Sequence, residues 1–117
     1  MTEFSLIFRN PVMTGAQPSP QQMQDVMKQW QDWFGSIGAQ NKIASMGNRL
    51  GSEGKTVKPN NLVTDGPYVE IKEFISGYII VKTENIDEAV ELAKGCPILH
   101  IGGNVEVRKV VGMNDNS

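Results

Sequence analysis

The sequence predicts a single α+β domain with the element order β-α-β-β-α-β, which is the ferredoxin-like plan. Three observations predict it. Apolar and polar residues alternate near the N-terminus, and two later segments repeat apolar residues at helical spacing. Runs of residues typical of strands follow each of these two segments. The chain has 117 residues, enough for one core, so we assign one domain to residues 1–113 and a short tail to 114–117.

The first strand and the first helix have the clearest local signals. Residues 4–9 alternate in the period of two that is typical of a strand. From Met23 to Ile37 apolar residues, including both tryptophans, recur every three or four positions, so we expect one apolar helix face packed in the core. The signals for the helix start are Ser19 as N-cap, Pro20 as first helical residue and Gln22 as the capping-box partner. Gly35 and Gly38 predict its end.

The middle of the chain reads as short strands joined by turns. Residues 40–46 suit a short strand, and glycines punctuate residues 47–58 as in a hairpin region. Val57 and Val63 flank Pro59-Asn60-Asn61, which is a turn sequence.

The second half repeats the helix-and-strand pattern. Residues 75–82 are the strongest strand prediction. Asn85 with Glu88 predicts the start of a second amphipathic helix, which Gly95 ends, and residues 105–111 predict the last strand.

The two helices of a ferredoxin-like unit cover one face of its sheet. Apolar residues nevertheless point to both faces of two predicted strands, as at Ile79, Ile80 and Val81. Two helices cannot cover both faces, so we expect a homodimer in which two sheets face each other, a dimeric α+β barrel.

Composition excludes several classes of function. The 11 basic and 13 acidic residues are not segregated, so nothing indicates a nucleic-acid partner. No apolar run is long enough to span a membrane, and the acidic N-terminus does not resemble a secretory signal. The single cysteine, Cys96, suits a reducing cytoplasm and a packing role. One histidine and one cysteine give no metal-ligand spacing, and we expect no cofactor.

One stretch, from Asp65 to Gly77, combines turn formers with four charged residues and runs into an apolar strand. Its sequence, Asp65-Gly66-Pro67-Tyr68-Val69-Glu70-Ile71-Lys72-Glu73, resembles the signature of the DGPF-domain branch of the YCII-related family. Tyr68 stands where that branch usually has phenylalanine. Further similarity covers Asp87-Glu88-Ala89, Cys96-Pro97 and residues 102–108.

The resemblance implies a dimeric α+β barrel with a pocket between helix and sheet that looks enzyme-like, without an established reaction. A histidine–aspartate pair has been suggested as catalytic in the wider YCII group. That histidine lies near the N-terminal helix, whereas the only histidine here is His100, so the pair cannot be carried over directly.

Six residues are the candidates for a site. Asp65 and His100 are the candidate catalytic groups, although an Asp in a turn usually accepts backbone hydrogen bonds and a lone loop histidine is usually just exposed. The candidate ligand-binding residues are Tyr68, Glu70, Lys72 and Arg108. Glu70 with Lys72 could instead be an ordinary ion pair on one strand face, and Glu106 with Arg108 could be a solvated strand face or part of an ion pair across a dimer seam. Arg108 has the planar fork that suits a carboxylate.

Two functions remain open at this point. The first is a small-molecule binding protein, or an enzyme whose reaction is not apparent, with a polar pocket near the Asp65 signature. The second is a non-catalytic regulatory or interaction module in which the signature is structural.

Overall fold

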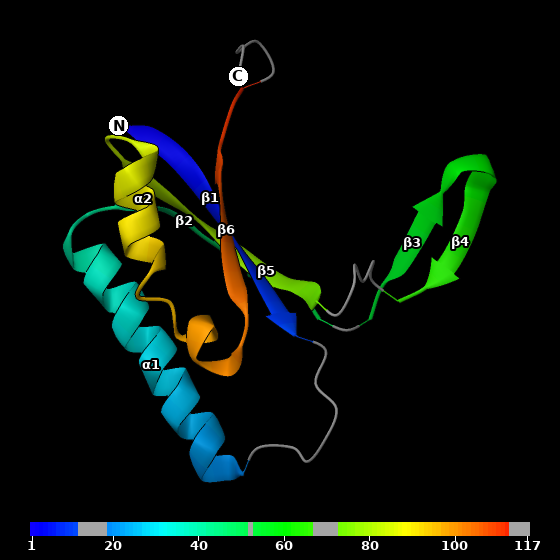
Figure 1. The fold of residues 1–117 in the computed structure, drawn as a ribbon, viewed down its shortest axis with the longest axis horizontal. Helices are drawn as coiled ribbons and strands as arrows, with labels where there is room; N and C mark the ends of the chain where they lie inside the picture. Colours follow the sequence, from blue (N-terminus) through cyan, green and yellow to red (C-terminus); the bar gives the residue numbers. More distant parts are fainter. Residues whose placement is uncertain (12–18, 52, 67–72, 113–117) are drawn as a thin grey trace.

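A computed structural model of the chain describes residues 1–11, 19–51, 53–66 and 73–112 (Figure 1). Four antiparallel strands form one sheet in the order β2-β5-β1-β6, which confirms the ferredoxin-like plan. The strands are β1 (Thr2–Pro11), β2 (Ile43–Arg49), β3 (Lys55–Lys58), β4 (Leu62–Asp65), β5 (Glu73–Thr83) and β6 (Asn104–Lys109). The helices are α1 (Pro20–Ala39) and α2 (Ile86–Ala93), with short 3-10 turns η1 (Pro59–Asn61) and η2 (Pro97–Ile101).

Strand β1 lies between β5 and β6 and supplies the centre of the core. Its residues Phe4, Leu6 and Phe8 are buried under the helices, and their partners on β5 include Ile79 and Val81, which are also buried. The two tryptophans join this core, as predicted: Trp33 is buried, and the partly buried Trp30 packs against it. The N-terminal part of the predicted apolar helix face does not, because Met23, Val26 and Met27 are exposed. The face of β1 that bears these side chains is therefore the covered face of the sheet.

Helix α1 starts as its sequence predicts and ends later. Ser19 accepts a hydrogen bond from the Gln22 backbone amide, and the Gln22 side chain accepts one from the Ser19 amide, which completes the capping box. The prediction that Gly35 and Gly38 end the helix is wrong, because both lie inside it. The chain leaves the helix at Asn41, which takes the left-handed conformation (φ 56°) often used for this purpose.

Helix α2 is attached at both of its ends. The Asn85 side chain accepts a hydrogen bond from the Glu88 backbone amide, and the buried Thr83 hydroxyl donates one to the Asn85 backbone carbonyl. Near its C-terminus the Leu92 carbonyl accepts the Trp33 indole N–H at 2.9 Å, which ties α2 to α1. Cys96 follows, fully buried, and burial raises the pKa of its thiol to about 11, so it packs as a neutral thiol, as predicted.

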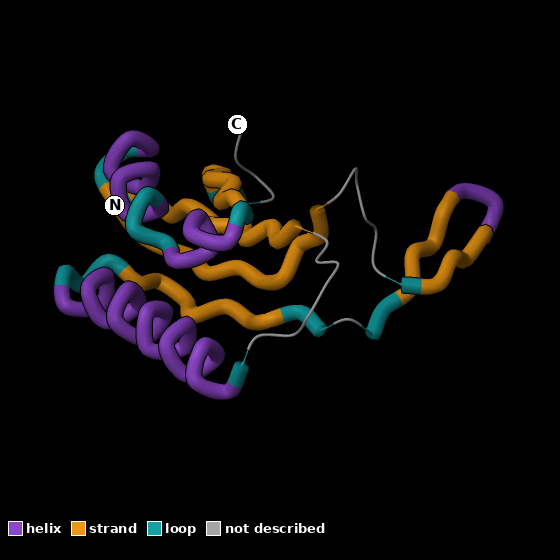
Figure 2. Tube along the Cα trace, turned by 60° about the horizontal axis from the view of Figure 1, so that its bottom comes forward, coloured by secondary structure: helices purple, strands orange, loops and turns teal. Residues whose placement is uncertain are grey.

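The hairpin of β3 and β4 lies apart from the four-stranded sheet (Figures 1 and 2). Val57 pairs with Val63 across it, around the predicted Pro59–Asn61 turn. Asn60 and Asn61 both have positive φ, 68° and 62°, which asparagine tolerates better than most residues. The last strand is shorter than predicted, since β6 ends at Lys109 and leaves Val110 and Val111 beyond it.

Two glycines make a matched test of this packing. A Cβ on Gly103 would lie 2.6 Å from the Arg9 carbonyl oxygen and 2.6 Å from Ile98 Cγ1, whereas one on Gly35 would meet nothing within 4 Å. We expect Gly103→Ala to lower the free energy of unfolding by about 1–3 kcal/mol through overpacking. Gly35→Ala should raise it by about 0.5–1 kcal/mol, since alanine suits a helix interior better. Urea unfolding measures both, and equal effects would contradict the close approach at Gly103.

Candidate functional site

The second face of the sheet, called the open face below, has no helix on it within the described ranges. In Figure 1 α1 and α2 lie to one side of the four strands, and the sheet turns its other side away from them. Alternation along each strand sends every second residue to this face. The open-face residues include Ser5, Ile7 and Arg9 on β1, Tyr78 and Ile80 on β5, and Glu106 and Arg108 on β6.

Glu106 lies at the centre of a charged cluster on the open face. The Arg9 side chain donates two hydrogen bonds to Glu106 Oε1, from Nε at 3.2 Å and Nη2 at 2.9 Å. Arg108 Nη1 donates to the other oxygen, Oε2, at 3.0 Å. The hydrogen bond from Arg108, followed by that from Arg9, lowers the pKa of Glu106 from its ordinary value. The carboxylate is therefore held charged between two guanidinium groups.

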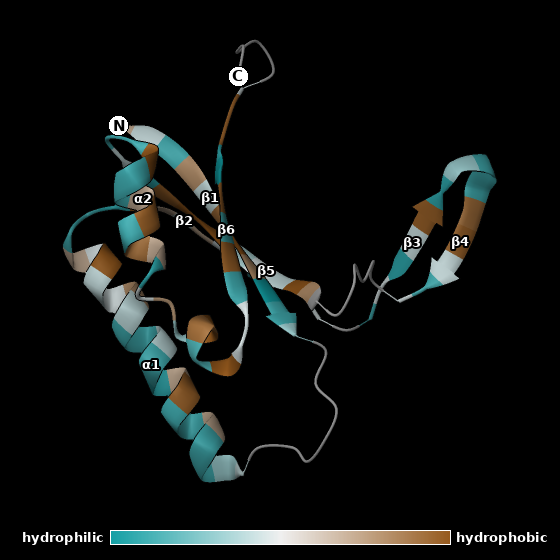
Figure 3. Cartoon of the chain, in the orientation of Figure 1, coloured by the Kyte–Doolittle hydropathy of each residue, from teal (hydrophilic) through white to brown (hydrophobic). Residues whose placement is uncertain are grey.

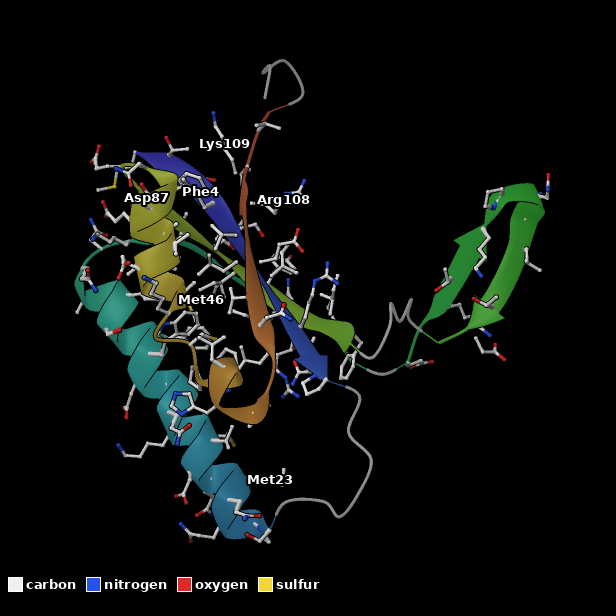
Figure 4. All side chains as sticks on the ribbon, viewed as in Figure 1. Phe4, Met23, Met46, Asp87, Arg108 and Lys109 are labelled. Atoms are coloured by element: carbon white, nitrogen blue, oxygen red, sulfur yellow. The ribbon has the colours of Figure 1, made fainter. Side chains whose placement is uncertain are left out.

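The cluster retains positive charge. Two guanidinium groups share one carboxylate, and an arginine has five N–H donors, of which Arg108 uses one on Glu106. The Arg108 side chain is 68% exposed, against 27% for Arg9 and 33% for Glu106. Figure 4 shows Arg108 pointing away from the helices, whereas Phe4 lies on their side. Arg108 is thus the more accessible cation of the cluster.

The middle of the open face is apolar and its far side is polar. Ile7 lies opposite Glu106 on β6 and opposite Tyr78 on β5, and Ile80 pairs with Ser5 on β1. The amide of Asn48 on β2 donates to the Tyr78 hydroxyl at 3.3 Å. A molecule on this face would meet cations at β6, aliphatic side chains in the centre, and the Tyr78 phenol of β5 with the Asn48 amide of β2. Such an arrangement can bind an amphipathic anion.

His100 lies in the layer of the helices, on the other side of the sheet. It belongs to η2, between the buried Pro97 and Ile98 and the start of β6. His100 lines an open depression of about 410 Å³, together with Gln29, Asp32, Trp33 and Ser36 of α1. Asp32 is also paired with Lys28 at 3.1 Å. The sheet therefore separates His100 from Arg108.

Asp65 ends β4 at the base of the hairpin. Its carboxylate accepts a hydrogen bond from Lys55 Nζ at 2.8 Å across the hairpin, and its side chain is 95% exposed. Within one chain the structure does not bring Asp65 and His100 together, because one lies on the projecting hairpin and the other beside α1 (Figure 1). The other predicted site residues, Tyr68, Glu70 and Lys72, lie outside the described residues.

Among the described residues, no group of three or more His, Cys, Asp or Glu side chains is placed to hold a metal ion. No helix in the described part of the chain is both long and apolar enough to cross a membrane.

The sequence indicated half of this cluster. The alternation predicted that Glu106 and Arg108 share one strand face, and on that face they form an ion pair at 3.0 Å within the chain. Arg9 was missed, although its place in the alternating segment 4–9 puts it on the face opposite Phe8. Tyr78 was missed for the same reason, since only its register with Ile7 shows that it shares the face.

The fold and this face define a small ferredoxin-like α+β protein with an arginine–glutamate cluster on the side of the sheet away from its helices. The family model of the YCII-related domain matches residues 11–114, and the chain therefore belongs to the YCII-related family. This confirms the family that the Asp65 signature resembles, while its assignment to the DGPF branch stays a prediction. No curated protein matches the chain significantly.

The cluster predicts a pH dependence of stability. Because the folded-state pKa of Glu106 is lowered, its contribution is present above its unfolded pKa, about 4.3, and is lost as pH falls through the folded value. The stability difference between wild type and Glu106→Gln should therefore shrink as pH falls from 6 to below 4.3. Urea unfolding across that range measures it, with Glu91→Gln as control, because Glu91 forms an exposed pair with Lys94. A difference that is constant with pH would contradict the cluster.

Proposed function

We propose that the open face is the floor of a binding site for small carboxylate-bearing molecules, formed where two copies of the chain meet. The observation that carries the proposal is the pair of guanidinium groups on one carboxylate, which leaves a net positive charge beside apolar side chains. The planar fork of Arg108 suits a carboxylate in a bidentate arrangement. Glu106 holds both arginines in place, so the ligand meets a pre-formed donor set.

The homodimer is part of this proposal. Ile7 and Ile80 are only half-buried at the centre of the open face, and no described element of the chain covers them. A second sheet packed on this face would remove them from water and enclose the charged cluster. Enclosure strengthens each electrostatic contact with a ligand because the local dielectric falls.

The signature residues complete the proposal. Asp65, Tyr68, Glu70 and Lys72 remain candidate ligand contacts, whereas His100, on the helix side of the sheet, is not part of the open-face site. The lowered pKa of Glu106 makes it a weak base, which favours binding over proton transfer at this cluster.

One observation favours the second function, a non-catalytic interaction module. Asp65 is occupied by Lys55 in a cross-strand ion pair, which is a structural task for the first residue of the signature. Such an exposed ion pair contributes about 0–1 kcal/mol to the free energy of unfolding. A role in shaping the hairpin therefore suits it better than a role in the stability of the whole domain.

We expect a mono-carboxylate with an apolar tail, such as a short-chain or aromatic acid, to raise the melting temperature of the wild type. The Arg108→Gln variant should bind it at least about tenfold more weakly, which is the loss of about 1.4 kcal/mol expected for a charge-assisted hydrogen bond. Binding is measured by calorimetry and by thermal shift.

Lys109→Gln is the matched control for this measurement. Lys109 is the next cation along β6 and is exposed, but alternation places it away from the open face (Figure 4). Its loss should leave the affinity unchanged. If both variants weaken binding equally, the effect is one of net charge and the site is wrong. If no carboxylate binds and Asp65→Asn distorts the hairpin, the result supports the second function, a non-catalytic interaction module.

Association of the chain has its own test. Ile80→Lys places a charge in the middle of the open face and should shift sedimentation from dimer to monomer, with a dissociation constant raised at least about tenfold. Ile86→Lys is the control, since Ile86 is comparably hydrophobic and 47% exposed but begins α2 in the helix layer. Dissociation by both variants, or by neither, would place the contact elsewhere.

A further inference from the structure

The hairpin of β3 and β4 presents an apolar surface without a core beneath it. Val57 is 69% exposed and Val63 is 51% exposed, while Leu62, on the other face of the hairpin, is 57% exposed. Val57 and Val63 are direct cross-strand partners, and Figure 3 shows hydrophobic positions on both strands. The described hydrogen bonds and the ion pair of residues 54–66 join one hairpin residue to another. A two-stranded hairpin of this length is marginal in water on its own.

The charges of the hairpin leave its apolar pair free to pack. Lys55 and Asp65 neutralise each other at 2.8 Å, and both lie two residues from the valines, on the same hairpin face. An apolar contact on this face therefore does not bury an unpaired charge.

The direction of the hairpin selects its partner. In Figure 1 the helices lie on one side of the four strands and the hairpin extends on the other side, toward which the open face turns. A second copy seated on the open face would approach within the reach of the hairpin. In a two-fold pair each copy would offer the same open face and the same hairpin. One symmetric interface would therefore cover the open face and the hairpin of both copies.

We propose that the β3–β4 hairpin is an arm that packs through Val57 and Val63 on a second copy of this chain and closes the edge of the site between the two sheets. This inference rests on the proposed dimer. It adds that the site is incomplete in one chain, because the partner supplies the wall at the hairpin end.

Hydrogen exchange on the full chain tests the arm. In the dimer we expect the backbone amides of β3 and β4 to exchange at least about tenfold more slowly than in the monomeric Ile80→Lys variant, since an unsupported hairpin opens readily. The amides of α2, which packs inside its own chain, serve as the internal control and should be equally protected in both. Equal exchange of the hairpin in dimer and monomer would overturn the arm.

Cross-linking identifies what the hairpin touches. A photoreactive benzophenone amino acid replaces Val57 in a mixture of isotope-labelled and unlabelled chains, and the same group at Lys94 on α2 is the control. Covalent pairs of one labelled and one unlabelled chain from position 57, and none from position 94, are expected. If the chain sediments as a dimer but position 57 links only within its own chain or to nothing, the arm is wrong and the dimer stands. If the wild type sediments as a monomer, the dimer itself is wrong.

Discussion

The pairing of β1 with both β5 and β6 is the constraint on which the core and the candidate site both depend. Because side chains alternate along a strand, Phe4, Leu6 and Phe8 bury themselves under the helices while Ile7 and Arg9 necessarily turn to the open face. A slip of one residue would exchange the two sets and expose the core. The apolar residues that fix the register for stability thus also fix the position of Arg9 against Glu106.

The chemistry available on the open face favours recognition over proton transfer. Two guanidinium groups hold Glu106 ionised, and a carboxylate with a lowered pKa accepts protons poorly near neutrality. The imidazole of His100, whose ordinary pKa suits acid–base work, lies on the other side of the sheet. The same arginines would attract an anion and orient it. Ile7 and Ile80 would bury its apolar part, so charge and hydrophobic contact act on one ligand at once.

Local signals in the sequence were reliable where the physics is local. The Ser19 capping box, the Asn85 cap and the Asn60-Asn61 turn each depend on neighbours within a few residues, and each was predicted. Gly35 and Gly38 misled, since a glycine only weakens a helix and the packing of Trp33 and Ile37 outweighs that cost. The contact of Arg9 with Glu106 spans 97 positions in sequence and depends on strand register, which no local pattern reveals.

The described ends of the Asp65–Gly77 signature have structural duties that explain part of its composition. Asp65 pairs with Lys55 and ends the hairpin, while Gly77 lies in β5 so close to β2 that a Cβ would come within 2.8 Å of the Asn48 carbonyl oxygen. A side chain there would push β2 off the sheet edge, so the position requires glycine. The signature therefore joins the arm to the sheet, and its two ends hold these elements.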